Sequence, residues 1–180
     1  MKRFAILVLS TVLSACVSGI PQNNNTSTNQ TVSARPPVTT ASYMTDQENE
    51  LKQALAGTSF RVVRSNNILA VILSGDAVFE TDTLLTSSAN EALQKIAPIF
   101  SRYHKTRISI IGYTDSGNPA SDRRLSEKQA EAVATVLKKA AKIANVRFWI
   151  EGSSPAPVST DEERRKNNHV DIILTPTFIQ

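Results

Sequence analysis

The fold is decided by residues 107–140, which read RISIIGYTDSGNPASDRRLSEKQAEAVATVLKKA. The stretch opens on Arg107–Tyr113, a short apolar run that predicts a β-strand. Turn-forming residues follow, and Asp122 can then cap a long helix. The apolar positions of that helix recur at helical spacing and are Leu125, Ala132, Val133, Val136, Leu137 and Ala140. A strand that leads directly into a long amphipathic helix is typical of α/β domains.

The flanking sequence continues this alternation of strands and helices. Further strands are predicted at 60–64, 68–73, 146–150 and 169–174. Capping boxes predict helix starts at Thr45, Ser88 and Thr160. The first helix should cover 46–56, and Pro98 should kink the second helix or remove one of its hydrogen bonds. From Ile68 the expected order is β-α-β-α-β-(α)-β, which predicts an α/β (α+β) sandwich with helices on a mixed sheet.

The first sixteen residues have the pattern of an export signal. Lys2 and Arg3 precede an apolar run that ends at Leu13, which has the length of a signal-peptide core and is too short to span a bilayer. The sequence Leu13-Ser14-Ala15-Cys16 resembles the bacterial lipobox. This resemblance implies that residues 1–15 are a lipoprotein signal peptide and that Cys16 carries a covalent lipid, including acyl chains such as palmitate. Two or three chains hold a protein stably on a membrane.

The alternative is an ordinary cleaved signal with an unrelated cysteine, although Cys16 is the chain's only cysteine. The next residue is Val17 and not an aspartate, which in enterobacteria-like sorting resembles an outer-membrane destination, with the domain on the periplasmic face.

Residues 16–44 are expected to form a disordered tether behind the acylated cysteine. They include the uncharged polar run 23–30, and Arg35 is the only charged residue between Val17 and Met44. Such a segment buries too little apolar surface to offset its chain entropy. A flexible chain of this length reaches on the order of 30 Å. An extension over 45–66 and a domain over 67–176 follow.

Composition excludes several classes of function. Without residues 1–15 the chain keeps 18 basic against 16 acidic residues, too small an excess to drive nucleic-acid binding. Aromatic residues make up only 6% of the chain, too few for base-stacking platforms. One cysteine excludes an intrachain disulfide and a cysteine-rich zinc site. His104 and His169 lie far apart in sequence and form no metal-binding motif, so we expect neither a metal nor a cofactor.

Three segments together are similar to the OmpA-like peptidoglycan-binding domain, over roughly 68–175. The first is DAVFETD at 76–82, followed by Leu84 and Leu85. The second combines IGYTD at 111–115 with LSEKQA at 125–130. The third is RRKNNHVD at 164–171. Each string alone is weak, but their order and spacing agree with the predicted strands and helices.

The resemblance implies a site for diaminopimelate, the cross-linking residue of Gram-negative peptidoglycan. In the family, an aspartate in a Thr-Asp pair and an arginine on the following helix hold this residue. A carboxylate accepts from its ammonium, and a guanidinium binds its carboxylate. Thr114 and Asp115 match the pair, while Asp115 could instead be a turn-capping residue.

The family arginine is replaced by Gln129, and the intervening loop is one residue shorter than usual. Loss of a charge-assisted bidentate contact should cost about 1.5–3 kcal/mol. Arg124 and Lys128 lie on the same helix and could compensate, or they could form a solvated basic face. Arg164 and Asn167 match the closing motif, whose adjacent arginines are replaced by asparagine and histidine.

These residues favour a non-enzymatic lipoprotein that docks on peptidoglycan and anchors the outer membrane, or an envelope complex, to the cell wall. The alternative is a structural subunit of an envelope-spanning secretion complex in which the domain binds protein and wall binding is weak or lost. In that alternative, the chain resembles the DotK/IcmN-type lipoproteins of type IVB secretion systems. An enzyme is disfavoured, because Ser153 and Ser154 lack the sequence context of a nucleophile and Cys16 is used by the anchor.

Overall fold

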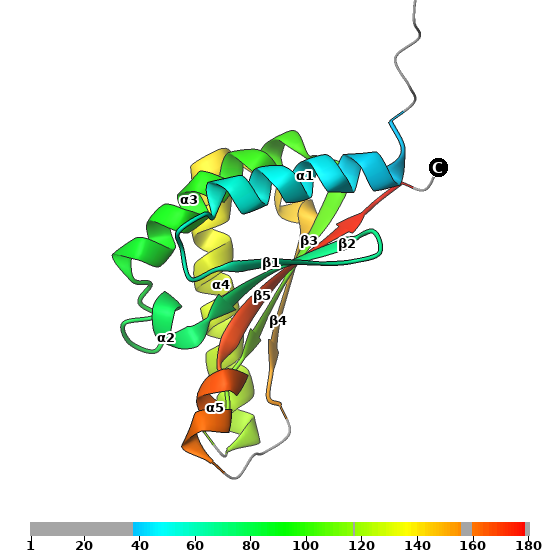
Figure 1. Ribbon diagram of the computed structural model, residues 1–180. Helices are drawn as coiled ribbons and strands as arrows, with labels where there is room; N and C mark the ends of the chain where they lie inside the picture. Colours follow the sequence, from blue (N-terminus) through cyan, green and yellow to red (C-terminus); the bar gives the residue numbers. More distant parts are fainter. Residues whose placement is uncertain (1–37, 117, 156–159, 179–180) are drawn as a thin grey trace, which may run out of the picture. The chain divides into compact units, whose positions relative to one another are not determined.

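The computed structural model describes residues 38–116, 118–155 and 160–178 (Figure 1). Cys16, residues 1–15 and most of the predicted tether lie outside the described residues. The helices are α1 Thr40–Ala54, α2 Gly75–Val78, α3 Ser87–Arg102, α4 Pro119–Ala141 and α5 Asp161–Asn167, with a short 3₁₀ turn at Asn145–Arg147. The strands are β1 Arg61–Ser65, β2 Ile68–Ser74, β3 Thr106–Tyr113, β4 Phe148–Ser153 and β5 His169–Pro176.

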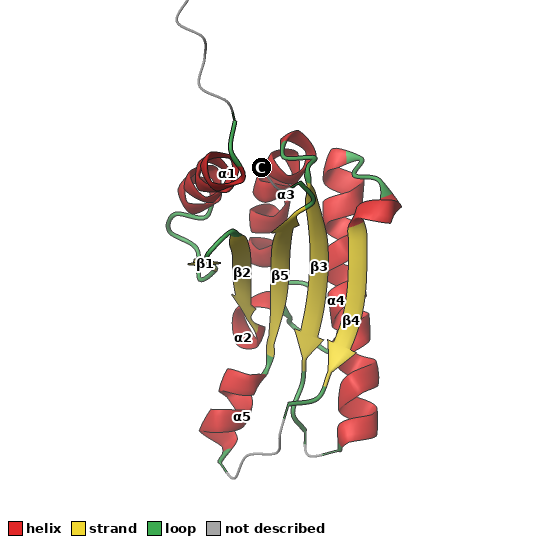
Figure 2. Ribbon diagram, turned by 90° about the vertical axis from the view of Figure 1, so that its right-hand side faces the viewer, coloured by secondary structure: helices red, strands yellow, loops and turns green. Residues whose placement is uncertain are grey.

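The strands form one sheet in the order β1-β2-β5-β3-β4. Neighbouring strands are antiparallel except for the parallel pair β3–β4, so the predicted mixed α/β sandwich is confirmed. Figure 2 shows α3 and α4 behind one face of the sheet and α1 beside its β1–β2 edge, while the strands on the face toward the viewer are uncovered. Burial along β3 follows this arrangement, because Ile108 and Ile110 are fully buried whereas Arg107 on the opposite face is exposed.

The core lies between the sheet and the three covering helices. The sheet contributes Leu69, Val71, Leu73, Ile108, Ile110, Val170, Ile172 and Leu174. The helices contribute Met44, Leu51, Leu93, Ile96, Phe100, Val133 and Leu137. Residues Pro37–Gln180 form one compact unit that contains all of the buried residues described, so this segment carries a complete core of its own.

Three helix starts differ from the predictions. Helix α1 is capped by Thr39, so residues 40–44 belong to the helix and not to the tether. The hydroxyl of Thr45 instead donates to the carbonyl of Ala41. Helix α3 is capped by Thr86 and continues through Pro98 to its end. Helix α4 is capped by Asn118, because the proline after it supplies a first helical residue that needs no hydrogen-bond acceptor.

The predicted extension at 45–66 contains most of α1 and the strand β1, which is part of the sheet. Strand β1 pairs with β2 along its whole length, and Asn66 between them adopts a positive φ of 53°, which a tight turn requires. The capping box at the start of α5 is confirmed, since Thr160 and Glu163 exchange hydrogen bonds.

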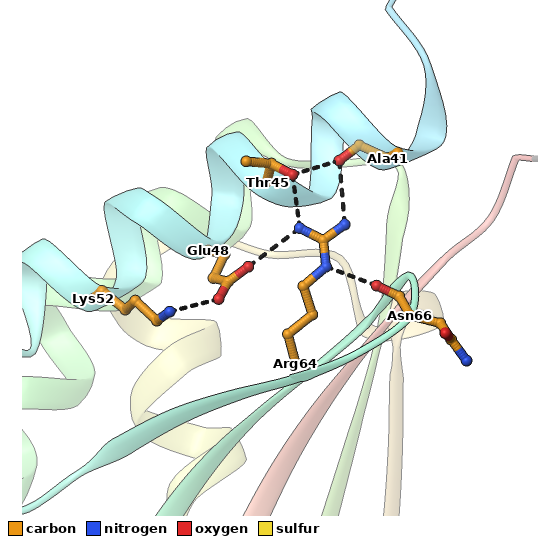
Figure 3. A network of polar contacts seen from close by, with 6 residues as sticks. All are labelled: Ala41, Thr45, Glu48, Lys52, Arg64 and Asn66. Atoms are coloured by element: carbon orange, nitrogen blue, oxygen red, sulfur yellow. Dashed lines mark hydrogen bonds and ion pairs between the residues drawn. The ribbon is translucent and has the colours of Figure 1, made fainter.

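Arg64 at the end of β1 fastens α1 to the sheet (Figure 3). Its guanidinium donates to the Thr45 hydroxyl at 2.7 Å, to a Glu48 carboxylate oxygen at 3.2 Å and to the Asn66 carbonyl at 2.6 Å. Lys52 donates to the other Glu48 oxygen at 2.6 Å. The pKa of Glu48 lies below its ordinary value because of these hydrogen bonds, first from Lys52 and then from Arg64, against an opposing effect of burial.

Replacement of Arg64 by alanine should lower the free energy of unfolding by about 1–2 kcal/mol, because several bonds to one partly buried charge are lost. Glu48 stabilises the fold when it is ionised, above its ordinary pKa of 4.5, and this contribution disappears as the pH falls through its lower folded value. The difference between wild type and variant should therefore be larger at pH 7 than at about pH 3. Urea unfolding at both pH values tests this, with Arg107→Ala as a control on an exposed arginine.

Candidate functional site

The candidate site lies where β3 ends. Thr114 and Asp115 directly follow this strand, and each is only 6% exposed. The backbone N–H of Thr114 donates to the carbonyl of Ser153, so the loop stays attached to the neighbouring strand β4. The carboxyl end of a parallel strand pair is a usual place for a ligand site in α/β sheets.

Two glycines let α4 approach the sheet closely enough to reach this loop. A Cβ atom on Gly112 of β3 would lie 2.0 Å from the carbonyl oxygen of Ser126, and one on Gly152 of β4 would lie 2.3 Å from that of Arg123. Only glycine fits at either position, because both obstacles are helix backbone. The Ser126 hydroxyl also donates to the Ser153 carbonyl at 3.0 Å. The first half of α4 is therefore fixed against the ends of β3 and β4.

The Asp115 carboxylate is held from the end of α5. The carboxylate Oδ2 accepts from the side-chain amide of Asn167 at 3.1 Å. The backbone N–H of Asp115 donates to the side-chain oxygen of Asn168 at 2.8 Å. Among the described residues no donor is bonded to Oδ1 of Asp115, which leaves this oxygen for a ligand.

The expectation that Asp122 caps α4 is wrong. Asp122 is a buried residue of the first turn of α4, and its Oδ1 accepts from the backbone N–H of Ser116 at 3.0 Å.

Gln129 connects two loops at the site. Its Oε1 accepts from the Thr114 hydroxyl at 3.1 Å, and its Nε2 donates to the carbonyl of Asp82 at 2.8 Å. The loop at 79–85 is closed by a bridge between Phe79 and Leu85. Gln129 therefore holds this loop beside the end of β3, with both ends of its amide already hydrogen-bonded.

A pocket of about 200 Å³ opens between these segments. It is lined by Asp76, Phe79, Thr81, Asp82, Thr114, Leu125, Gln129, Asn168 and His169. Among the described residues, the lining carries carboxylates and hydrogen-bonding groups but neither lysine nor arginine. The pocket can accept hydrogen bonds from a cationic group, whereas it offers an anion no permanent positive charge.

The sequence model of the OmpA family matches residues 78–169, about half of the chain. The chain belongs to the OmpA family. This match confirms the resemblance drawn from the three sequence segments.

Known proteins resemble this OmpA-family chain in sequence and in structure. The curated protein "Probable lipoprotein YiaD" of Escherichia coli (strain K12) is 34% identical over 141 residues, which cover 74% of this chain and 64% of the length of that relative. A MotB-like protein from Desulfovibrio vulgaris has a similar structure, with a TM-score of 0.65 and 19% identity over 76% of this chain and 93% of its own.

The cell wall anchor of the type VI secretion system from Pseudomonas aeruginosa also has a similar structure. Its TM-score is 0.60 and its identity 24%, over 72% of this chain and 99% of its own. At these identities the two structures show a shared fold alone.

Of the predicted OmpA-type site residues, Thr114 and Gln129 line the pocket, whereas Asp115 and Asn167 are bonded to each other beside it and are not lining residues. Arg124 and Lys128 are exposed on α4 and do not line it. Arg164 is half-buried on α5, with one guanidinium nitrogen 3.7 Å from the exposed Asp161 carboxylate. The structure thus brings Thr114, Asp115, Gln129 and Asn167 together through hydrogen bonds, without any of the predicted cations.

His169 is an additional lining residue with a fixed orientation. Its ring stacks on Tyr113, with centroids 4.4 Å apart and planes 18° from parallel. By its sequence position, His169 replaces a family arginine and could be either a ligand contact or a packed residue at the start of a strand. No local pattern predicts the stacked pair, because the two residues become cross-strand neighbours only through the register between β3 and β5.

Within the described ranges, no cluster of three or more His, Cys, Asp or Glu side chains could hold a metal ion. None of the described helices is long and apolar enough to cross a membrane.

Substitution of Gln129 by arginine should strengthen binding of a diaminopimelate-containing peptide about ten- to a hundredfold, because a bidentate cation would enter a pocket that lacks one. Arginine has five donors and can also keep the bond to the Asp82 carbonyl. Isothermal titration of wild type and variant with L-Ala-γ-D-Glu-meso-diaminopimelate measures the gain. The variant Gln94→Arg adds the same charge at an exposed position of α3 and should leave the affinity unchanged.

Proposed function

We propose that this chain is an outer-membrane lipoprotein whose periplasmic domain docks non-covalently on peptidoglycan through the diaminopimelate of the stem peptide. The observation that carries the proposal is the buried Asp115 carboxylate at the end of β3, whose Oδ1 has no donor among the described residues. Membership of the OmpA family, the lipoprotein name of the relative YiaD and the description of the Pseudomonas protein as a cell wall anchor all support this function.

In this proposal the ligand ammonium donates to Asp115. Asn167 and Asn168 fix that carboxylate and its backbone from the other side, so little reorganisation is needed on binding. The Thr114 hydroxyl and the Gln129 amide form the adjoining wall. Without an arginine the ligand carboxylate meets only neutral donors there, which predicts weaker binding at a single site than a charge-assisted pair would give.

Weak single-site binding is compatible with anchoring. The proposed lipid on Cys16 confines the domain to the membrane surface, and the polar segment before α1 spans the gap to the wall. Peptidoglycan presents the same peptide many times, so the local ligand concentration near a confined domain reaches the millimolar range. Attachment then depends on repeated short contacts and needs no covalent step.

Two observations favour a second candidate function. Both ends of the Gln129 amide are bonded within the chain, and the pocket lining contains neither lysine nor arginine. These features fit a domain that has lost wall binding and serves as a structural subunit of an envelope-spanning secretion complex, of type IVB for instance, bound to other envelope proteins.

Co-sedimentation with purified diaminopimelate-type sacculi distinguishes the two functions. Residues 37–180 should sediment with the sacculi, and Asp115→Asn should lower the bound fraction at least about tenfold, because it removes the charge that the ammonium needs. Asp46→Asn makes the same change on the exposed surface of α1 and should bind like the wild type.

If wild type and Asp115→Asn sediment equally, Asp115 is not the ligand carboxylate. If neither sediments, whereas Gln129→Arg does, the fold retains the site but natural wall binding has been lost, and the structural-subunit function is supported instead.

A further inference from the structure

A second and larger pocket adjoins the first on the uncovered side of the sheet. It encloses about 600 Å³ between β1, β2, α2, α5 and β5. The two pockets have three lining residues in common, Asp76, Asn168 and His169, so they share one wall. A ligand longer than one amino acid can therefore extend from the first pocket past His169 into the second.

Most of this second pocket comes from residues outside the segment that matches the family model. Arg61, Ile72 and Asp76 precede residue 78, and Asp171 follows residue 169. Strand pairing places Arg61 beside Ile72 and Ile72 beside Asp171, in one row across β1, β2 and β5. The apolar Ile72 thus separates a guanidinium on one side from a carboxylate on the other.

The two charged groups in this row have unused hydrogen-bonding capacity. The Oδ1 atom of Asp171 is buried and has no hydrogen-bond partner. Burial raises the pKa of Asp171, although His169 and Arg61 both act to lower it. The exposed Arg61 forms no hydrogen bond or ion pair with any of the described residues. A buried acceptor without a donor is unfavourable, which is a reason to expect a ligand donor at this position.

His169 adds a second acceptor beside Asp171. Its Nδ1 lies 3.0 Å from the carbonyl of Asn167, and a carbonyl only accepts, so Nδ1 carries the hydrogen. In the neutral ring Nε2 is then an acceptor, and it lies 3.9 Å from Oδ2 of Asp171. Stacking on Tyr113 holds the ring in this orientation. An N–H group placed between Nε2 of His169 and Oδ2 of Asp171 would share its hydrogen between these two acceptors, and a further donor is needed for Oδ1.

We infer that the second pocket binds an N-acylated amino acid with a free α-carboxylate, whose carboxylate pairs with Arg61 and whose amide N–H donates to Asp171 and His169. This inference rests on the proposed function, because the same peptide would occupy both pockets. The γ-linked D-glutamate beside diaminopimelate in the stem peptide has this chemistry, since its linkage leaves the α-carboxylate free. The second pocket would then distinguish this residue from its amidated form, D-isoglutamine.

The test compares two peptides that differ at this carboxylate only. The probes are L-Ala-γ-D-Glu-meso-diaminopimelate and the same peptide with D-isoglutamine, titrated into residues 37–180. The wild type should bind the glutamate peptide about tenfold more tightly, and Arg61→Gln should abolish this preference by weakening the glutamate peptide alone. Arg107→Gln removes the same charge from the same face of the sheet, outside the pocket, and should retain the preference.

The outcomes separate this inference from the proposed function. If the wild type does not discriminate between the peptides, or if Arg61→Gln still does, the inference is overturned. The proposed function survives that result provided that Asp115→Asn abolishes binding of both peptides. If the wild type binds neither peptide, both are overturned. Circular dichroism of the Arg61 variant checks that the exposed substitution leaves the fold intact.

Discussion

The close seating of α4 on the backbones of Gly112 and Gly152 is the constraint on which the site depends. A Cβ atom on Gly112 would lie 2.0 Å from the backbone of Ser126, and one on Gly152 would lie 2.3 Å from the backbone of Arg123. Any side chain at either position would therefore collide with the helix. This contact brings Gln129 within hydrogen-bonding distance of Thr114 and holds the 79–85 loop over the end of β3. The pocket lined by Thr114 and Gln129, next to Asp115 in the chain, is therefore built by packing, and its geometry exists before a ligand arrives.

The two pockets present different charged groups to a ligand. The first offers carboxylates and neutral groups, and the second offers an unpaired arginine beside a carboxylate with a buried, unbonded oxygen. A peptide with an ammonium near one end and a carboxylate one residue away would complement both. The first pocket has glutamine at position 129, and the guanidinium of Arg61 lines the second pocket from a strand that the family model does not include.

Sequence patterns predicted most of the strands and helices, because apolar periodicity reports directly which face of an element is buried. They also led to Thr114, Asp115, Gln129 and Asn167, through resemblance to a motif. Helix starts were less predictable: Thr39, Thr86 and Asn118 are caps, yet nearby residues have equally suitable side chains. The pairing of β1 with β2 and the placement of Arg61 and Asp171 on either side of Ile72 depend on strand register, which no local pattern specified.

The most direct measurement is an NMR titration of ¹⁵N-labelled residues 37–180 with L-Ala-γ-D-Glu-meso-diaminopimelate. If the end of β3 is the ligand site, the largest shifts should occur at the amides of Thr114, Asp115, Gln129 and Asn168. The amides of α1 and of the far half of α4 should remain unchanged. Saturable shifts confined to another surface, or no shifts at millimolar peptide, would contradict a peptidoglycan site at Asp115.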